Sequence, residues 1–175
     1  MKPTASMTGW RGSVGIAADA NQTARGIAIT DYGNEFRGTY TNGSSYATIA
    51  TGKTLTQNEW HHCAGTVNNT EFKLYFDGVL VKTQTINWGT ATLNANARFE
   101  VGVDLPGTDE KFTGNYSDVR CYCTALDDDA IRQLYEVGAK IDNKGNLHTY
   151  EINENGSNKL KKSGVFYNYA SEPYI

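Results

Sequence analysis

The sequence has no long apolar segment and no excess of positive charge, and each of these shortages excludes a class of protein. Its 175 residues include 3 prolines and carry a formal net charge of −3 at pH 7. A negative charge without a basic stripe argues against a nucleic-acid partner. No apolar run approaches the roughly 20 residues of a membrane-spanning helix, so we expect no membrane insertion. The start, MKPTASMTGW, lacks the apolar core of a signal peptide, which indicates cytoplasmic synthesis or a piece of a longer protein.

Cysteine is also scarce, and its number is odd. Cys63, Cys121 and Cys123 cannot build a complete disulfide framework. A bond between Cys121 and Cys123 on an extended strand would be strained. We therefore expect three buried free thiols in a protein that folds in a reducing compartment.

The sequence is rich in the residues of β-structure. It contains 18 glycines and 11 tyrosines, and short β-forming runs alternate with Gly and Asn. The run EFKLYF places Phe72, Leu74 and Phe76 on one side of a strand, and Asp77-Gly78 then predicts a type I′ hairpin turn. These patterns predict an all-β sandwich or barrel. The expected strands lie at 25–31, 35–41, 45–51, 60–67, 71–76, 79–86, 97–104 and 112–126.

One short helix is predicted near residues 127–137. Asp127 suits the N-cap, further acidic residues follow in the first turn, and Gly138 suits the position just beyond the end. The acidic run is therefore interpreted as helix-start chemistry rather than as a calcium site. From residue 140 the apolar content falls, and we expect 140–175 to be a C-terminal β extension or a linker to a further module.

Three adjacent potential metal ligands, His61, His62 and Cys63, raise the question of a zinc site. Side chains alternate across a strand, so His62 should point away from the other two. The spacing also differs from that of common zinc sites. We interpret the motif as structural, and a half-site of His61 and Cys63 is the alternative.

Three segments of the sequence resemble the laminin G-like domains of the concanavalin A-like superfamily. They are, in chain order, NEWHHCAGTVNNTEFKLYFDGVLV, FEVGVD and FTGNYSDVRCYCTALDDDAIRQLYEVG. The resemblance covers residues 2–138 and implies a two-sheet antiparallel jelly-roll sandwich with one short helix. That domain would span residues 1–139 and lack the family's usual first strand, because Lys2-Pro3-Thr4 is similar to the tail of that element. The tail after residue 137 is similar in composition to bacteriophage tail proteins.

No pattern of catalytic residues accompanies this resemblance. Glucanases of the superfamily carry Glu-x-Asp-x-x-Glu on one strand, and no Glu-x-Asp occurs here. The histidines do not accompany a Gly-x-Ser-x-Gly elbow, and Gly52-Lys53-Thr54 lacks the first glycine of a phosphate loop. We predict that the chain is not an enzyme.

Binding is the favoured function. Sugar-binding sandwiches use exposed aromatic residues and polar loops, and each large aromatic side chain could equally cover the core. Calcium is the only cofactor that the sequence suggests, in the loop before residue 112, although a solvated loop explains the same residues. The candidate ligand-binding residues are Trp10, Arg11, Tyr32, Tyr46 and Trp88, and the candidate calcium ligands are Asp104, Asp109 and Glu110.

These observations predict a recognition module that binds a cell-surface carbohydrate or glycoprotein. Its expected setting is a phage virion or the extracellular surface. The alternative is an assembly module that packs against a homo-oligomer partner or a neighbouring virion subunit, which an apolar patch along an open sheet edge would support. A glycan-cleaving enzyme or its accessory domain is a weaker alternative.

Overall fold

The computed structural model describes residues 1–17, 25–42, 46–87, 98–103, 110–122 and 124–137, together with four short strands that follow. All of the strand pairs are antiparallel. The strands are β1 Lys2–Pro3, β2 Trp10–Ala17, β3 Arg25–Tyr32, β4 Glu35–Asn42, β5 Tyr46–Thr54, β6 Cys63–Val67, β7 Glu71–Phe76, β8 Val79–Thr85, β9 Arg98–Val101 and β10 Gly114–Asn115.

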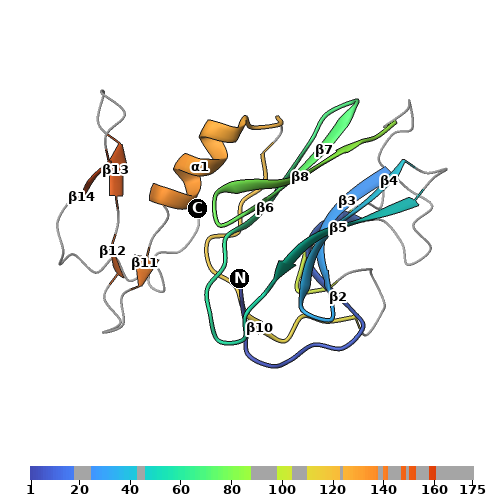
Figure 1. The fold of residues 1–175 in the computed structure, drawn as a ribbon, viewed down its shortest axis with the longest axis horizontal. Coiled ribbons are helices and arrows are strands. Elements are labelled where there is room, and N and C mark those ends of the chain that lie inside the picture. Colours follow the sequence, from blue (N-terminus) through green and yellow to red (C-terminus); the bar gives the residue numbers. More distant parts are fainter. Residues whose placement is uncertain are drawn as a thin grey trace.

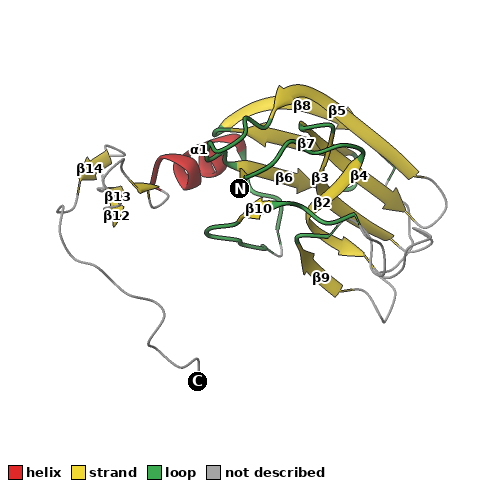
Figure 2. Cartoon of the chain, turned by 90° about the horizontal axis from the view of Figure 1, so that it is seen from below, coloured by secondary structure: helices red, strands yellow, loops and turns green. Residues whose placement is uncertain are grey.

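Two sheets face each other and form a sandwich (Figure 1). One has five strands in the order β5-β4-β3-β2-β9, and the other has three in the order β6-β7-β8. β1 and β10 form a separate pair. Figure 2 shows β9 at the margin of the sandwich. The expectation of an all-β antiparallel fold is confirmed.

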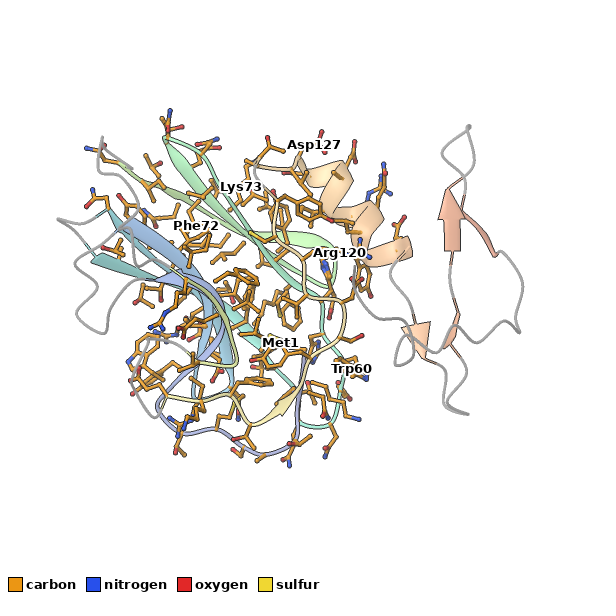
Figure 3. All side chains as sticks on the ribbon, turned by 180° about the vertical axis from the view of Figure 1, so that it is seen from behind. Met1, Trp60, Phe72, Lys73, Arg120 and Asp127 are labelled. Carbon is orange, nitrogen blue, oxygen red and sulfur yellow. The ribbon has the colours of Figure 1, made fainter. Side chains whose placement is uncertain are left out.

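The core lies between the two sheets and is built by strand alternation. Phe72 and Leu74 on β7 are 1% and 0% exposed, and Figure 3 shows Phe72 among the side chains that fill the interior. Phe36 on β4 meets them from the other sheet. Gly38 allows this close approach, because a Cβ there would lie 2.8 Å from Leu74. The remaining members of the core cluster are Tyr40, Ile49, Leu55 and Ile86.

Within the described residues one helix, α1 Asp128–Val137, packs against part of the outer face of the three-stranded sheet, near the β7–β8 turn (Figure 1). The Ala130 amide donates to the Asp127 carboxylate at 2.8 Å, so the predicted N-cap is confirmed. The Tyr75 hydroxyl of β7 donates to Asp128 Oδ1 at 2.9 Å, and Tyr75 is fully buried. Tyr135 contacts the β7–β8 turn, where a Cβ on Gly78 would lie 2.6 Å from its ring. The helix thus forms a third layer.

Two expectations about the strands were wrong. β2 was not predicted, because Gly12 and Gly15 weaken the β-forming signal and a bulge after Gly12 breaks the alternation. The strand expected over residues 112–126 is limited to β10 in the part of that segment that is described. Asp118 has φ of 55°, which ends an extended run. Cys121 is consequently exposed, contrary to the expectation of three buried thiols; Cys123 lies outside the described residues.

Beyond the helix, the described residues form two hairpins of short strands. β11 Lys140–Ile141 pairs with β12 Leu147–His148, and β13 Tyr150–Ile152 pairs with β14 Asn158–Leu160. The division of the chain at residue 139 remains a prediction. Within the described residues, α1 is neither long nor apolar enough to span a bilayer, and no other helix is present there that could do so.

Candidate functional site

The candidate site lies on the outer face of the five-stranded sheet, near the β3–β4 turn. In this sheet Phe36 points into the core, so its neighbours Glu35 and Arg37 point outward. Tyr32 is paired with Glu35 in register and Trp10 is paired with Tyr32, which places all four residues on the same face. Tyr32 is 45% exposed.

The local sequence holds this end of the sheet in place. Gly33 and Asn34 have φ of 58° and 67°, the left-handed values of a type I′ turn. The Gly33 amide donates to the Gly9 carbonyl at 3.2 Å, and the Met7 amide donates to Asn34 Oδ1 at 2.8 Å. These bonds join the turn to the segment before β2 and so fix where Trp10 begins its strand.

Trp10 and Tyr32 form an aromatic pair. Their ring centroids are 4.9 Å apart with an interplanar angle of 51°. The guanidinium carbon of Arg37 lies 5.5 Å from the Trp10 ring and 5.1 Å from the Tyr32 ring. Both distances are within the range of cation–π attraction, so the two rings and the guanidinium restrain one another.

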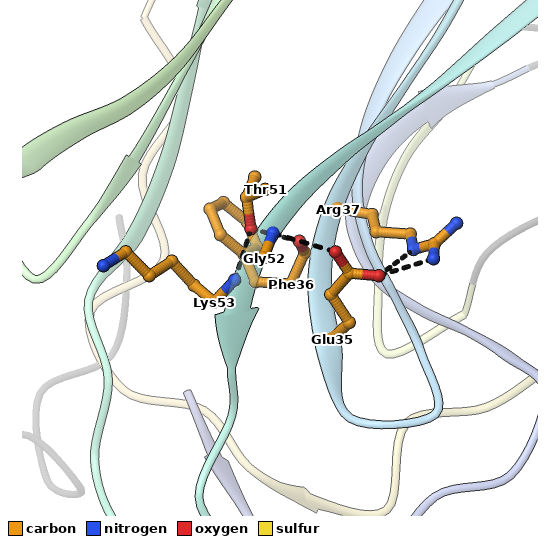
Figure 4. Close-up of polar contacts among 6 residues, drawn as sticks. All are labelled: Glu35, Phe36, Arg37, Thr51, Gly52 and Lys53. Carbon is orange, nitrogen blue, oxygen red and sulfur yellow. Dashed lines mark hydrogen bonds and ion pairs between the residues drawn. The ribbon is translucent and has the colours of Figure 1, made fainter.

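Glu35 holds Arg37 in this position (Figure 4). Its Oε2 accepts hydrogen bonds from Arg37 Nε at 2.8 Å and Nη2 at 2.5 Å. Its Oε1 accepts a hydrogen bond from the Gly52 amide of β5 at 2.8 Å. Because both of its oxygens accept hydrogen bonds, the Glu35 carboxylate is fixed between β4 and β5. It in turn holds the Arg37 guanidinium beside the rings of Trp10 and Tyr32.

The strand positions beside this cluster carry small or polar side chains. Thr30 lies opposite Arg37, and its hydroxyl is 3.4 Å from that of Thr39. Gly15 packs against Ala28, where an added Cβ would lie 2.7 Å from the Ala28 Cβ. Trp10, Tyr32, Glu35 and Arg37 are here called the aromatic–arginine cluster. The residues beside this cluster on the neighbouring strands therefore have small side chains.

The structure brings together two of the five predicted ligand-binding residues, Trp10 and Tyr32. Arg11 alternates to the other face, pairs in register with the buried Asp31, and donates through Nη1 to the Trp10 carbonyl at 2.7 Å. The backbone of Tyr46 begins β5, opposite Thr41. Trp88 lies outside the described residues.

Glu35 and Arg37 were missed by the sequence analysis. The run EFRGTYT was recognised as a strand, and its alternation around a buried Phe36 was the available signal. That alternation does not reveal which aromatic residues lie on the neighbouring strands. The register of β2 and β3, which brings Trp10 opposite Tyr32, supplies this information.

The calcium prediction falls largely outside the described part of the chain. Asp104 and Asp109 lie outside it. Glu110 is described, and its backbone carbonyl accepts a hydrogen bond from the Gly12 amide at 3.0 Å. The described residues contain no group of three His, Cys, Asp or Glu side chains that could hold a metal ion. A calcium site that includes Asp104 and Asp109 stays a prediction.

The His-His-Cys motif has structural contacts. His61 Nε2 accepts from the Thr56 amide at 3.1 Å, which leaves the proton on Nδ1, 3.1 Å from Asp77 Oδ2. His62 packs against the ring of Tyr135, and burial, followed by the nearby N-terminal amine, lowers its pKa. Cys63 packs against the core, where burial raises its pKa to about 12. The contacts of this motif thus stabilise the packing of β6 against β7 and α1.

Comparisons with known proteins agree with this architecture. The family model described as the concanavalin A-like lectin/glucanases superfamily (Laminin_G_3) matches residues 1–132. A solved structure of the Ruminococcus gnavus IT-sialidase CBM40 is similar with a TM-score of 0.60 and 17% identity, over 75% of this chain and 77% of that one.

A second structure of that CBM40 domain, bound to α2,3-sialyllactose, is similar with a TM-score of 0.58 and 16% identity. This match covers 76% of the chain described here and 78% of the other. No match was found among curated proteins. At such low identity the structural likeness shows the fold, a jelly-roll β-sandwich.

Proposed function

The chain belongs to the concanavalin A-like lectin/glucanase superfamily, and from this premise we propose that it is a carbohydrate-binding module without catalytic activity. The binding site is the aromatic–arginine cluster. The observation that carries the proposal is the partly exposed Trp10–Tyr32 pair, with its rings 4.9 Å apart beside a fixed ion pair on the outer face of a sheet.

This arrangement suits the amphipathic surface of a sugar. Aromatic rings offer flat apolar area to the C–H face of a pyranose at a low entropic cost, since each side chain has only two rotatable bonds. Arg37 and Glu35 offer donors and acceptors for hydroxyl groups around the rim of the ring. The cluster lies on strands rather than on loops, so little further ordering is needed when a ligand binds.

The absence of catalysis is part of the proposal. Most glycoside hydrolases use two carboxyl groups that flank the scissile bond, one of which delivers a proton. Glu35 instead accepts two hydrogen bonds from Arg37 and one from Gly52. These contacts suit a residue that positions a ligand. The similar CBM40 structure belongs to a carbohydrate-binding module, which supports the same assignment.

The proposed partner is a cell-surface glycan or glycoprotein, and the proposed setting is extracellular. The similar domain that was solved with sialyllactose supports a carbohydrate as the partner. A phage virion is the finer setting suggested by the sequence of the tail. It stays a prediction.

Assembly is a second candidate function, and strand β9 favours it. Phe99 and Val101 on this strand are 45% and 44% exposed. β9 is the last strand of its sheet within the described residues. An edge strand with exposed apolar side chains is suited to pair with another chain. A concentration-dependent dimer that Phe99→Lys dissociates would establish this role, whereas a monomer at all concentrations would exclude self-association.

Glycan-array binding of the purified chain, followed by calorimetry on the best ligand, tests the proposed site. Trp10→Ala and Tyr32→Ala should each lower affinity by about tenfold or more, as expected for a central aromatic contact. Tyr122→Ala is the matched control, because Tyr122 is 44% exposed and lies on the segment that leads to α1. The proposal would be contradicted if all three variants lost the same glycan affinity, or if Trp10→Ala and Tyr32→Ala lost none.

A further inference from the structure

The charge of Arg37 is already compensated inside the aromatic–arginine cluster. Glu35 Oε2 receives both Nε and Nη2, and its Oε1 is fastened to the Gly52 amide, so the carboxylate cannot swing aside without losing that bond. Lys53 extends away from Glu35 on the other side of β5 (Figure 4). The pair therefore presents polar atoms without a net charge.

The pair still has unused hydrogen-bonding capacity. Figure 4 shows the third guanidinium nitrogen, Nη1, directed away from Glu35. It makes no hydrogen bond to another described residue, so two N–H donors are left. Glu35 Oε1 accepts one hydrogen bond and has a second lone pair. A donor and an acceptor thus stand at the two ends of the Glu35–Arg37 pair, and the guanidinium end lies over two aromatic rings.

We propose that this site selects neutral glycans with adjacent hydroxyl groups and discriminates against acidic ones. The proposal rests on the carbohydrate-binding function proposed above and names the ligand class of the same site. One hydroxyl accepts from Arg37 Nη1, and its neighbour donates to Glu35. A carboxylate on a sugar that approached Arg37 would face the carboxylate of Glu35 at close range, and such like-charge contacts are strongly unfavourable.

The test compares each neutral oligosaccharide with its acidic counterpart. Suitable pairs are lactose with α2,3-sialyllactose, and neutral hexose oligomers with the corresponding uronates. The measured quantity is the ratio of neutral to acidic affinity, obtained from a glycan array and then by calorimetry. We expect the unmodified chain to bind the neutral member at least about tenfold more tightly.

Glu35→Gln removes the charge and keeps an oxygen for the Gly52 amide. We expect this variant to shift the ratio toward acidic glycans by about tenfold or more, and its binding of them to weaken as salt is raised. Glu100→Gln is the matched control: Glu100 pairs with Arg98 at 3.3 Å and stands on β9 of the same sheet. It should leave the ratio unchanged. Circular dichroism and thermal unfolding verify that both variants are folded.

The outcomes separate the two proposals. In one outcome the unmodified chain prefers acidic glycans while Trp10→Ala and Tyr32→Ala still abolish binding. That result would overturn the neutral-ligand inference and leave the proposed function standing. An unchanged ratio in Glu35→Gln would also overturn the inference. Both proposals would be overturned if Trp10→Ala and Tyr32→Ala left glycan binding unchanged, or if the chain bound neither member of any neutral–acidic oligosaccharide pair.

Discussion

Two tyrosines on the outer faces of the two sheets have opposite surroundings. Tyr75 on β7 is fully buried beneath α1, whereas Tyr32 on β3 is 45% exposed. Strand alternation directs both away from the core. The difference arises because the chain returns as a helix over the three-stranded sheet, while in the described residues no helix covers the five-stranded one. Burial beneath α1 lets Tyr75 stabilise the domain, whereas the exposed ring of Tyr32 is available to a ligand.

The largest expected contrast is between alanine substitutions of these two tyrosines. Tyr75→Ala should lower the free energy of unfolding by about 3–5 kcal/mol, because it empties a buried site and removes the hydrogen bond to Asp128. Tyr32→Ala should cost less than about 1 kcal/mol and still weaken glycan binding. Urea unfolding measures both changes. Similar losses of stability in the two variants would mean that the outer faces do not differ as described.

The two hairpin turns give a second contrast of the same kind. Gly33 and Gly78 have φ of 58° and 77°, so alanine is strained at either position. A Cβ at Gly33 meets nothing within 4 Å, whereas one at Gly78 lies 2.6 Å from Tyr135. We expect Gly33→Ala to cost about 1 kcal/mol and Gly78→Ala about 2–4 kcal/mol in unfolding free energy. Equal costs would show that α1 yields readily to the added methyl group.

Mild acid should weaken the covered layer through His62. Burial lowers the pKa of His62 in the folded chain from the usual value of 6.5. The unfolded chain therefore binds the proton more readily, so stability is complete above pH 6.5 and declines as the pH falls through the lowered pKa. The melting temperature should fall between pH 7 and pH 5, and His62→Phe should flatten that slope. Tyr32→Ala serves as the control, and a slope that survives in His62→Phe would exclude this histidine as its source.

The smallest expected effect concerns the exposed end of the same layer. Hydrogen bonds from Tyr75 and then Lys73 lower the pKa of Asp128 from its usual 3.8. The contribution of Asp128 to stability is present above pH 3.8 and is lost as the pH falls further. Asp128→Asn should lower the melting temperature slightly at pH 7 and leave it unchanged near pH 2. Asp129→Asn, at a more exposed position, is the control. A larger effect at pH 2 than at pH 7 would contradict this account.

Local patterns in the sequence were sufficient to predict much of the fold. The alternation of EFKLYF correctly placed Phe72 and Leu74 in the core, and Asp127 caps the helix as expected. The burial of Tyr75 could not be predicted in this way. It depends on α1, which begins more than fifty residues later in the chain and packs across β7.

The candidate site was only partly predictable for a similar reason. Trp10 and Tyr32 were chosen as aromatic residues near loops, but their contact depends on the register of β2 against β3. The glycines that obscured β2 also hid that register. Arg37 completes the cluster from a third strand, so no contiguous sequence contains the site.

The position of α1 also determines how the domain can be displayed. Because α1 packs against the three-stranded sheet, it ends at Val137 on the side of the sandwich away from the five-stranded sheet that carries the aromatic–arginine cluster (Figure 1). A module attached beyond α1 would therefore join the domain at the sheet that does not carry the proposed site. Several copies anchored side by side could then engage one polymeric glycan together, and weak single contacts would add up to durable adhesion through avidity.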